Sequence, residues 1–251
     1  LGPAKLAAGP STQTRRKTSG RLATSGDSLP AMRHAVVTGA NRGIGLELAR
    51  QLATDGWRVS GVCRTSSAEL RDAADAVWDG IDVSSADLRE ALRVAAGEAS
   101  IELLINCAGI LQRETLDDLN VANIRRQFEV NSLGPLRVTE ALLPNLVQGS
   151  KLVVITSRMG SIADNSSGAR YGYRMSKAAV NMAFASLAHD LAAREIAVGI
   201  LHPGFVRTGM TGGNGNWNAD EAAAALLERI GELDLASSGR FVHANGEQLP
   251  W

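Results

Sequence analysis

Short apolar runs alternate along the chain with segments in which apolar positions recur at helical spacing. Residues 34–38 (HAVVT) form the first run, and residues 44–55 then place apolar side chains on one face of a helix. Parallel strands need such crossover helices, and strands that are apolar throughout are typical of a sheet covered on both faces. The pattern predicts one doubly wound α/β domain with a mostly parallel, seven-stranded sheet. Further strands are expected at residues 57–63, 76–83, 102–106, 151–157, 197–201 and 240–243, and further helices at 86–98, 120–148, 173–193 and 220–231.

Composition narrows the classes of function. The chain has 26 basic and 26 acidic side chains and a formal net charge of zero, so neither nucleic acid nor an anionic membrane is expected as a partner. No apolar run reaches the ~18 residues that a membrane span needs. Cys63 and Cys107 end apolar segments and are expected to be buried thiols, and the four histidines are scattered, so no metal is expected. A cytoplasmic protein is the interpretation that fits.

The first 31 residues differ from the rest of the chain. They are rich in Gly, Ser, Thr, Pro and basic residues, with Asp27 as the single acid, and they lack the apolar core of a secretory signal. The composition also fits an organelle transit peptide, so organelle import stays open. Because Met32 directly precedes the first strand, we expect a disordered or non-native leader over residues 1–31 and a domain over residues 32–251.

A glycine-rich turn, TGANRGIG at residues 38–45, joins the first strand to the first helix. Glycines allow the backbone to approach a pyrophosphate closely, and a helix N-terminus offers unpaired N–H groups to it. The spacing differs from the common G-x-G-x-x-G fingerprint, but its position between strand and helix favours a dinucleotide site in a Rossmann fold. The residues expected to face the cofactor here are Gly39, Asn41, Arg42, Gly43, Ile44 and Gly45.

The end of the second strand bears on the choice of cofactor. An acidic residue there binds the ribose of NAD, whereas arginine accommodates the 2′-phosphate of NADP. The strand ends at Arg64 without an acid, and Arg42 in the glycine turn is a second cation within reach. We therefore expect NADP(H), with NAD(H) the less favoured cofactor. The alternative is that both arginines are solvated surface residues.

Several motifs follow the glycine turn in a fixed order. They are Asp82-Val83, N-x-A-G at residues 106–109, Asn131, Ser157, Y-x-x-x-K at residues 173–177, P-G at residues 203–204, and Thr208. Together they resemble the short-chain dehydrogenase/reductase family over residues 32–251. Residues 168–177, together with residues 158–160 and the closing GEQLPW at 246–251, resemble its carbonyl-reductase-like or C-factor-like branch.

The resemblance implies an oxidoreductase that interconverts a carbonyl and an alcohol by hydride transfer. Tyr173 would be the general acid/base, Lys177 would hold the nicotinamide ribose, Ser157 would bind the carbonyl oxygen and Asn131 would order a water in a proton relay. The same resemblance implies that the cofactor contacts Asp82, Val83, Asn106, Ala108, Gly109, Tyr173, Lys177, Pro203, Gly204, Val206 and Thr208.

The spacing of Tyr173 and Lys177 places both on one helix face. An ammonium ~4 Å from a phenolate contributes up to ~4 kcal/mol at an effective dielectric of ~20, which would lower the tyrosine pKa by roughly three units. Tyr171 lacks a lysine four residues later. Ser157 is preferred to Ser161 because it ends a strand, although it lies further from Tyr173 than is usual in the family.

Other expectations concern substrate and assembly. The Gly- and Asn-rich segment 209–218 is expected to be a mobile loop over an open, permissive pocket. The helices at 120–148 and 173–193 commonly form an interface in this family, so a homodimer or homotetramer is expected. An NADPH-binding signalling or redox-sensing module is the alternative function. Nucleotide-sugar chemistry is disfavoured, because little chain remains for a substrate domain.

Overall fold

The computed structural model describes residues 32–251, so the leader expected at residues 1–31 lies outside the described part. Seven strands form one sheet in the order β3-β2-β1-β4-β5-β6-β7, and every neighbouring pair is parallel. The predicted doubly wound Rossmann fold and its seven strands are confirmed. The strands are β1 His34–Thr38, β2 Arg58–Val62, β3 Ala76–Trp78, β4 Ile101–Asn106, β5 Leu146–Ile155, β6 Ala197–His202 and β7 Phe241–His243.

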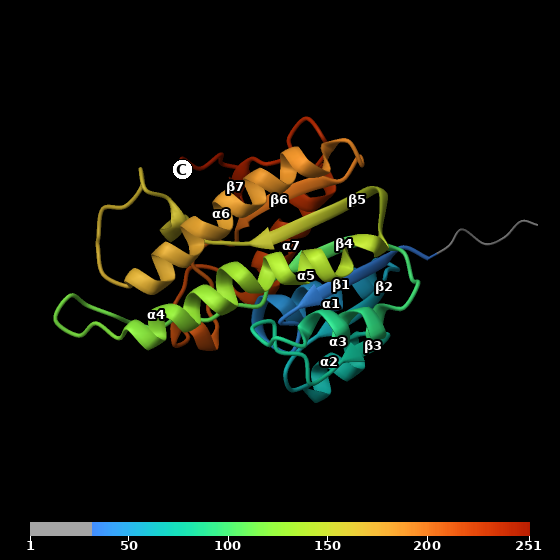
Figure 1. Cartoon of the computed structure of the whole chain (residues 1–251), viewed down its shortest axis with the longest axis horizontal. Coiled ribbons are helices and arrows are strands. Elements are labelled where there is room, and N and C mark those ends of the chain that lie inside the picture. Colours follow the sequence, from blue (N-terminus) through green and yellow to red (C-terminus); the bar gives the residue numbers. More distant parts are fainter. Residues whose placement is uncertain (1–31) are drawn as a thin grey trace, which may run out of the picture. The chain divides into compact units, whose positions relative to one another are not determined.

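Helices cover both faces of the sheet (Figure 1). One apolar cluster joins the sheet to α3, α5 and α6, and a second joins its other face to α1, α2 and α7. All five residues of β1 are buried, which explains why its sequence is apolar without alternation. The helices are α1 Gly43–Thr54, α2 Ala68–Ala73, α3 Leu88–Ala96, α4 Val121–Phe128, α5 Gly134–Leu142, α6 Tyr171–Ala192 and α7 Ala219–Glu232.

The prediction of one long helix at residues 120–148 is wrong, because the helix is interrupted in its middle and ends earlier. A π-helical turn, Glu129–Leu133, separates α4 from α5, and α5 ends at Leu142. Pro135 lacks the N–H that an α-helix would direct to the carbonyl of residue 131, which favours a widened turn there. Pro144 then follows α5, and β5 begins at residue 146 instead of 151.

Smaller corrections have local causes. The strand expected at 76–83 ends at Trp78, because Asp79 accepts hydrogen bonds from Ser66 and Gly80 has a φ of +76°. The six-residue α2 was not predicted, since a single buried residue gives it no periodicity. The helix expected at 86–98 begins at residue 88, because the hydroxyl of Ser85 bonds to Asp87 instead of capping a helix.

Candidate active site

A cleft of about 480 Å³ lies where the carboxyl ends of the central strands meet the glycine turn. In doubly wound sheets ligands bind at this edge, where the strand order reverses between β1 and β4. Most residues that the sequence placed at a cofactor line it. These are Gly39, Asn41, Arg42, Gly43, Ile44, Gly45, Arg64, Asp82, Val83, Ala108, Gly109, Tyr173, Lys177, Pro203 and Thr208.

Five expected site residues do not line the cleft itself. Four of them are at most 7% exposed and lie behind its wall, while Gly204 is partly exposed and packs toward His243. These four are Asn106, Asn131, Ser157 and Val206. Any role they have therefore acts at the cleft edge or through a neighbour.

Sequence reasoning missed several lining residues, among them Cys107, Ile110, Val130 and Thr156. Cys107 and Thr156 directly follow β4 and β5, and Val130 lies on the π-helical turn. The rule that ligands meet the carboxyl ends of parallel strands could have found those after the strands. The others are Val62, Cys63, Thr65, Ile81, Ile155, Gly209 and Met210.

The glycine turn leaves no room for side chains at two of its positions. Gly39 has a φ of +69°, and a Cβ there would lie 2.8 Å from the Cα of Ala108. A Cβ on Gly45 would lie 2.3 Å from the carbonyl oxygen of Gly39. The turn is also tied to the segment after β2, because Asn41 donates to the carbonyl of Thr65. The start of α1 therefore lines the cleft, and the unpaired N–H groups of a helix N-terminus favour an anion such as a pyrophosphate.

Two arginines lie beside this end of the cleft. Arg64 forms a 3.7 Å ion pair with Asp82, whereas Arg42 has no ion pair within residues 32–251. Burial acts to raise the pKa of Asp82, but two hydrogen bonds from Ser84 and the charge of Arg64 lower it overall. Asp82 therefore stays ionised and neutralises part of the Arg64 charge, so Arg42 is the less compensated cation.

Asn131 lies on the π-helical turn and is fully buried. Its amide accepts from the N–H of Ile110 and donates to the carbonyl of Ile110, both at 2.8 Å, and it also donates to Ser176 at 3.0 Å. Ser176 in turn donates to the carbonyl of Tyr173. Asn131 thus joins the loop after β4 to α6.

Tyr173 and Lys177 lie at the other end of the cleft, and Ser157 lies beside Tyr173 without lining the cleft. The Tyr173 side chain is 8% exposed, and its burial raises the pKa of the phenol, while an interaction with Ser157 acts to lower it. Tyr171, by contrast, does not line the cleft. Ser161 is turned away, because its hydroxyl accepts from the N–H of Asp164.

The sequence predicted that Lys177 lowers the pKa of Tyr173, and this prediction is wrong for the observed geometry. The Lys177 ammonium donates to the carbonyl of Ile155 at 2.9 Å and lies 5.8 Å from the centre of the Tyr173 ring. The lysine is therefore directed at a backbone carbonyl and not at the phenol oxygen. Burial lowers the pKa of Lys177 to about 8.

Cys107 lies close to Lys177 on the cleft wall. Burial raises the pKa of its thiol to about 12, which the lysine charge only partly opposes. Burial also raises the pKa of Cys63. Both cysteines are thus protonated thiols at neutral pH. Cys63 is buried as expected, whereas Cys107 lines the cleft and is partly exposed.

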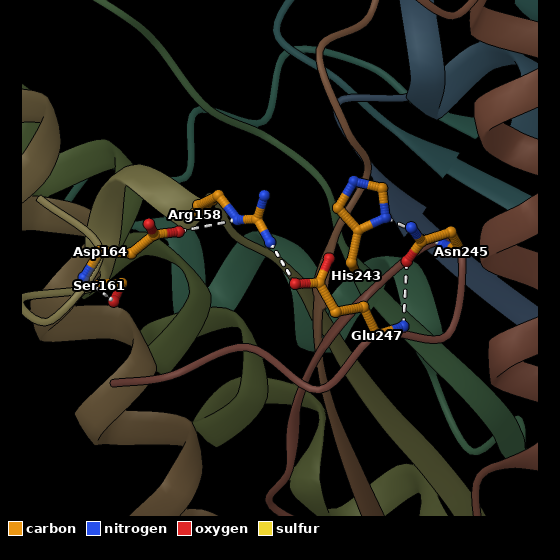
Figure 2. Close-up of polar contacts among 6 residues, drawn as sticks. All are labelled: Arg158, Ser161, Asp164, His243, Asn245 and Glu247. Carbon is orange, nitrogen blue, oxygen red and sulfur yellow. Dashed lines mark hydrogen bonds and ion pairs between the residues drawn. The ribbon is translucent and has the colours of Figure 1, made fainter. Parts of the chain in front are cut away.

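Arg158, directly after Ser157, joins two segments of chain beside the cleft. Figure 2 shows its guanidinium between Asp164, on the loop before α6, and Glu247, near the C-terminal end. The two ion-pair distances are 2.9 and 2.8 Å. A further backbone bond, from Ala163 to the carbonyl of Trp251, holds the same two segments together. The chain around Ser157 is therefore fixed from both sides.

Two histidines continue this network at the ends of β6 and β7. The rings of His202 and His243 meet edge to face, with centroids 4.9 Å apart. Burial and the charges of His243, Arg158 and Lys177 lower the pKa of His202 to about 3. His202 is therefore neutral at physiological pH and is not a candidate for a proton switch.

The Gly- and Asn-rich segment after β6 folds back on itself. Val206 forms a bridge with Trp217, and the N–H of Arg207 donates to the carbonyl of Trp217. A Cβ on Gly215 would lie 2.5 Å from the backbone nitrogen of Arg207, so this glycine permits close backbone packing. The permissive pocket and the mobility of this loop stay predictions.

Neither a metal-binding cluster nor a membrane-spanning helix is found in residues 32–251. No cluster of three or more His, Cys, Asp or Glu side chains there could hold a metal ion. Among the helices of this part of the chain, none is both long and apolar enough to cross a membrane. The expected cytoplasmic location stays untested.

Known sequences place the chain in a family. The short chain dehydrogenase family model matches residues 33–219. The 1-hydroxy-2-glutathionyl-2-methyl-3-butene dehydrogenase of Rhodococcus sp. (strain AD45) is 39% identical over 226 residues, which cover 88% of this chain and all of that protein. The C-signal protein of Myxococcus xanthus is 43% identical over 154 residues, or 60% of this chain and 93% of that protein.

Solved structures agree with this placement. An NADPH-bound carbonyl reductase from chicken fatty liver superposes with a TM-score of 0.79 at 27% identity, over 88% of this chain and 99% of that one. The carbonyl reductase Sniffer of D. melanogaster superposes with a TM-score of 0.80 at 27% identity, over 88% of this chain and all of that one. The motifs, the fold and these matches together establish that the chain belongs to the short-chain dehydrogenase/reductase family of oxidoreductases, in its carbonyl-reductase-like branch.

Proposed function

We propose that the protein interconverts a carbonyl and an alcohol with NADP(H), with Tyr173 as the general acid/base. The observation that carries the proposal is the convergence of a buried tyrosine and a buried lysine on one end of a cleft whose other end is a tight glycine turn. The glycine turn fits a dinucleotide, because Gly39 and Gly45 let the backbone pack tightly against Ala108 and against the turn itself at the start of α1, where a pyrophosphate would bind. Bound there, the nicotinamide would supply or accept the hydride.

Side chains of the protein donate and accept the proton. In the reducing direction the phenol of Tyr173 gives its proton to the substrate oxygen as negative charge develops on it, and takes it back in oxidation. The raised pKa of Tyr173 favours the protonated form that reduction needs. The hydroxyl of Ser157 donates a hydrogen bond to the same oxygen. Lys177, whose ammonium lies 5.8 Å from the centre of the Tyr173 ring, would hold the nicotinamide ribose, and Asn131 holds the loop after β4 and α6 in place around the tyrosine.

The preference for NADP(H) has two supports. Arg42 lines the cleft without an ion pair among residues 32–251, so it can meet a 2′-phosphate. Two structural neighbours were solved with NADPH or NADP bound, the chicken carbonyl reductase and a short-chain dehydrogenase/reductase from Burkholderia multivorans, 26% identical with a TM-score of 0.78. The ion pair of Arg64 makes it the weaker candidate.

Arg42→Ala is expected to lower kcat/KM with NADPH by about 10- to 100-fold and to leave kcat/KM with NADH nearly unchanged. The reason is that a charge-assisted phosphate contact contributes about 1.5–3 kcal/mol. Steady-state kinetics with both cofactors measure the change. Arg50→Ala is the matched control, because Arg50 lies on α1, the helix that Arg42 precedes, and pairs with Glu47. Equal losses with both cofactors, or a wild type that prefers NADH, would contradict the assignment.

Carbonyl reduction is expected to slow as pH rises through about 8, since the ammonium of Lys177 loses its proton there. Above that point kcat/KM should fall about tenfold per pH unit, as for loss of one essential proton. The lowered pKa also means that the folded chain binds fewer protons than the unfolded chain between about pH 8 and 10.5, so this group makes stability rise with pH in that window. A reduction rate that stays flat to about pH 9.5 would show that the charge of Lys177 is not needed.

The function itself is tested by following NADPH oxidation with a panel of aldehydes, ketones and quinones. The alternative, an NADPH-binding signalling or sensing module, has one support in the likeness to the C-signal protein. Binding of NADPH without turnover on any carbonyl or alcohol would favour it. The relative from Rhodococcus is named as a dehydrogenase of a glutathionyl alcohol, so alcohols with NADP⁺ belong in the panel.

We also propose a homo-oligomer. Beside the outward face of α6, Met182 is 70% exposed and Ile162 is 81% exposed, next to a hollow that Trp251 helps to line. An apolar patch of this kind is typical of a surface that meets a partner. Light scattering of the chain at two concentrations tests whether it is larger than a monomer.

A further inference from the structure

One side of α4 and the π-helical turn carries two amides that are completely buried, Gln127 and Asn131. They lie four residues apart, so their side chains stack on the same face of the helix. Asn131 already belongs to the proposed catalytic set. Gln127 has no assigned role, although burying an amide is costly unless every polar atom finds a partner.

Both amides hold the loop that follows β4. Asn131 binds the N–H and the carbonyl of Ile110, and Gln127 accepts from the N–H of Gln112 at 2.9 Å. Gln127 then donates to the carboxylate of Glu114 at 2.6 Å. The bonded residues of the loop are every second one, as in an extended segment laid along the helix.

The same two amides also meet α6, which runs alongside α4 (Figure 1). Asn131 donates to the hydroxyl of Ser176, and a Cβ on Gly172 would lie 2.3 Å from the amide nitrogen of Gln127. Gly172 and Ser176 are one helical turn apart, and Tyr173 lies between them. The two contacts therefore hold α6 one residue before and three residues after the tyrosine.

Glu114 completes the second contact. Its residue is 1% exposed, one carboxylate oxygen binds Gln127, and the other is buried without a hydrogen-bond partner. Its backbone carbonyl accepts from the N–H of Arg170, the residue that precedes α6. A buried acid near the start of a helix is favoured by the helix dipole. Glu114 thus connects the loop to the residue before α6 through its backbone, and to Gln127 of α4 through its side chain.

Resting on the proposed function, we propose that Gln127 and Glu114 are positioning residues that set where Tyr173 presents its hydroxyl. They would act on the tyrosine through the first turn of α6, with no contact to the substrate or cofactor. Small displacements of a reacting group are costly, since a shift of about 1 Å can lower a rate by roughly 100-fold.

The test compares Gln127→Leu, Glu114→Leu and Glu114→Gln with Arg125→Ala, whose side chain is exposed on the same helix. The two leucine variants should lower kcat for carbonyl reduction by about 10- to 100-fold while the Kd for NADPH stays within about twofold. Glu114→Gln should keep most of the activity, because its amide oxygen can still accept from Gln127. Arg125→Ala should match the wild type.

A second readout does not depend on turnover. The chain has two tyrosines, so in a Tyr171→Phe background the ¹³C signal of a labelled tyrosine reports Tyr173 alone. Gln127→Leu should shift that signal and move the pKa of Tyr173 down toward its ordinary value as water reaches the ring, whereas Arg125→Ala should not.

The outcomes separate the two proposals. Unchanged kcat and an unchanged tyrosine signal in a folded Gln127→Leu protein would overturn the positioning role. Loss of NADPH binding in parallel with kcat would also overturn it, because the effect would then be general destabilisation. A wild type without turnover would refute the proposed function, and the tyrosine signal would still decide whether Gln127 positions Tyr173.

Discussion

Tyr173→Phe is expected to lower kcat for carbonyl reduction by about 10²–10⁴-fold, the usual contribution of a positioned acid. The substitution removes one oxygen from a buried ring and leaves the aromatic packing in place, so the fold should be kept. NADPH should still bind, because the glycine turn and Arg42 lie at the other end of the cleft. Stopped-flow or steady-state NADPH oxidation, with fluorescence titration of NADPH, measures both quantities.

Tyr171→Phe is the matched control for this substitution. The same atom is removed two residues earlier in the same helix, from a side chain that does not line the cleft. Near-wild-type turnover is expected. If Tyr171→Phe abolished turnover and Tyr173→Phe did not, the acid would have been assigned to the wrong tyrosine.

Gly45→Ala is expected to raise the Kd for NADPH by at least about 100-fold. The new Cβ would lie 2.3 Å from the carbonyl oxygen of Gly39 and 2.9 Å from its carbon, and both are backbone atoms that cannot rotate away. The turn must open, which moves the N–H groups of α1 out of position for a pyrophosphate. Overpacking of this kind typically destabilises a fold by about 1–3 kcal/mol, so the Tm should fall as well.

Gly231→Ala is the control for that prediction. Gly231 is the second-last residue of α7, and a Cβ there meets no atom within 4 Å. Alanine is about 1 kcal/mol better than glycine in a helix interior and gains less than this in the last turn, so this variant should be at least as stable as the wild type, with an unchanged Kd. Unchanged NADPH binding in Gly45→Ala would show that the close approach at this turn is not needed for the cofactor.

The fold could be predicted from the sequence because local pattern and tertiary environment agree. Strands such as β1 are apolar on both faces, and each is followed by a helix or a glycine turn. The break between α4 and α5 was not predicted, since periodicity continues through Asn131 and only Pro135 signals a change. The short helix α2 leaves almost no periodic signal.

The site was predictable to the extent that motifs mark it. The glycine turn, Tyr173 and Lys177 do converge on one cleft. The electrostatics were not predictable, because helical spacing places Lys177 near Tyr173 without saying where its ammonium points. That direction is set by the carbonyl of Ile155, which comes from β5 and is remote in the sequence. No role was predicted for Gln127 or Glu114 for the same reason, because their contacts join elements that are separate in the sequence.

The chemistry of the two cysteines has a practical consequence. Cys63 and Cys107 are the only thiols in the sequence, and the pKa of each is raised by burial. Maleimides and similar reagents attack the thiolate, so they should react slowly with either residue at neutral pH. A cysteine introduced at exposed Val94 of α3 would then be the one fast-reacting thiol, and a fluorophore could be attached there without first removing the native cysteines.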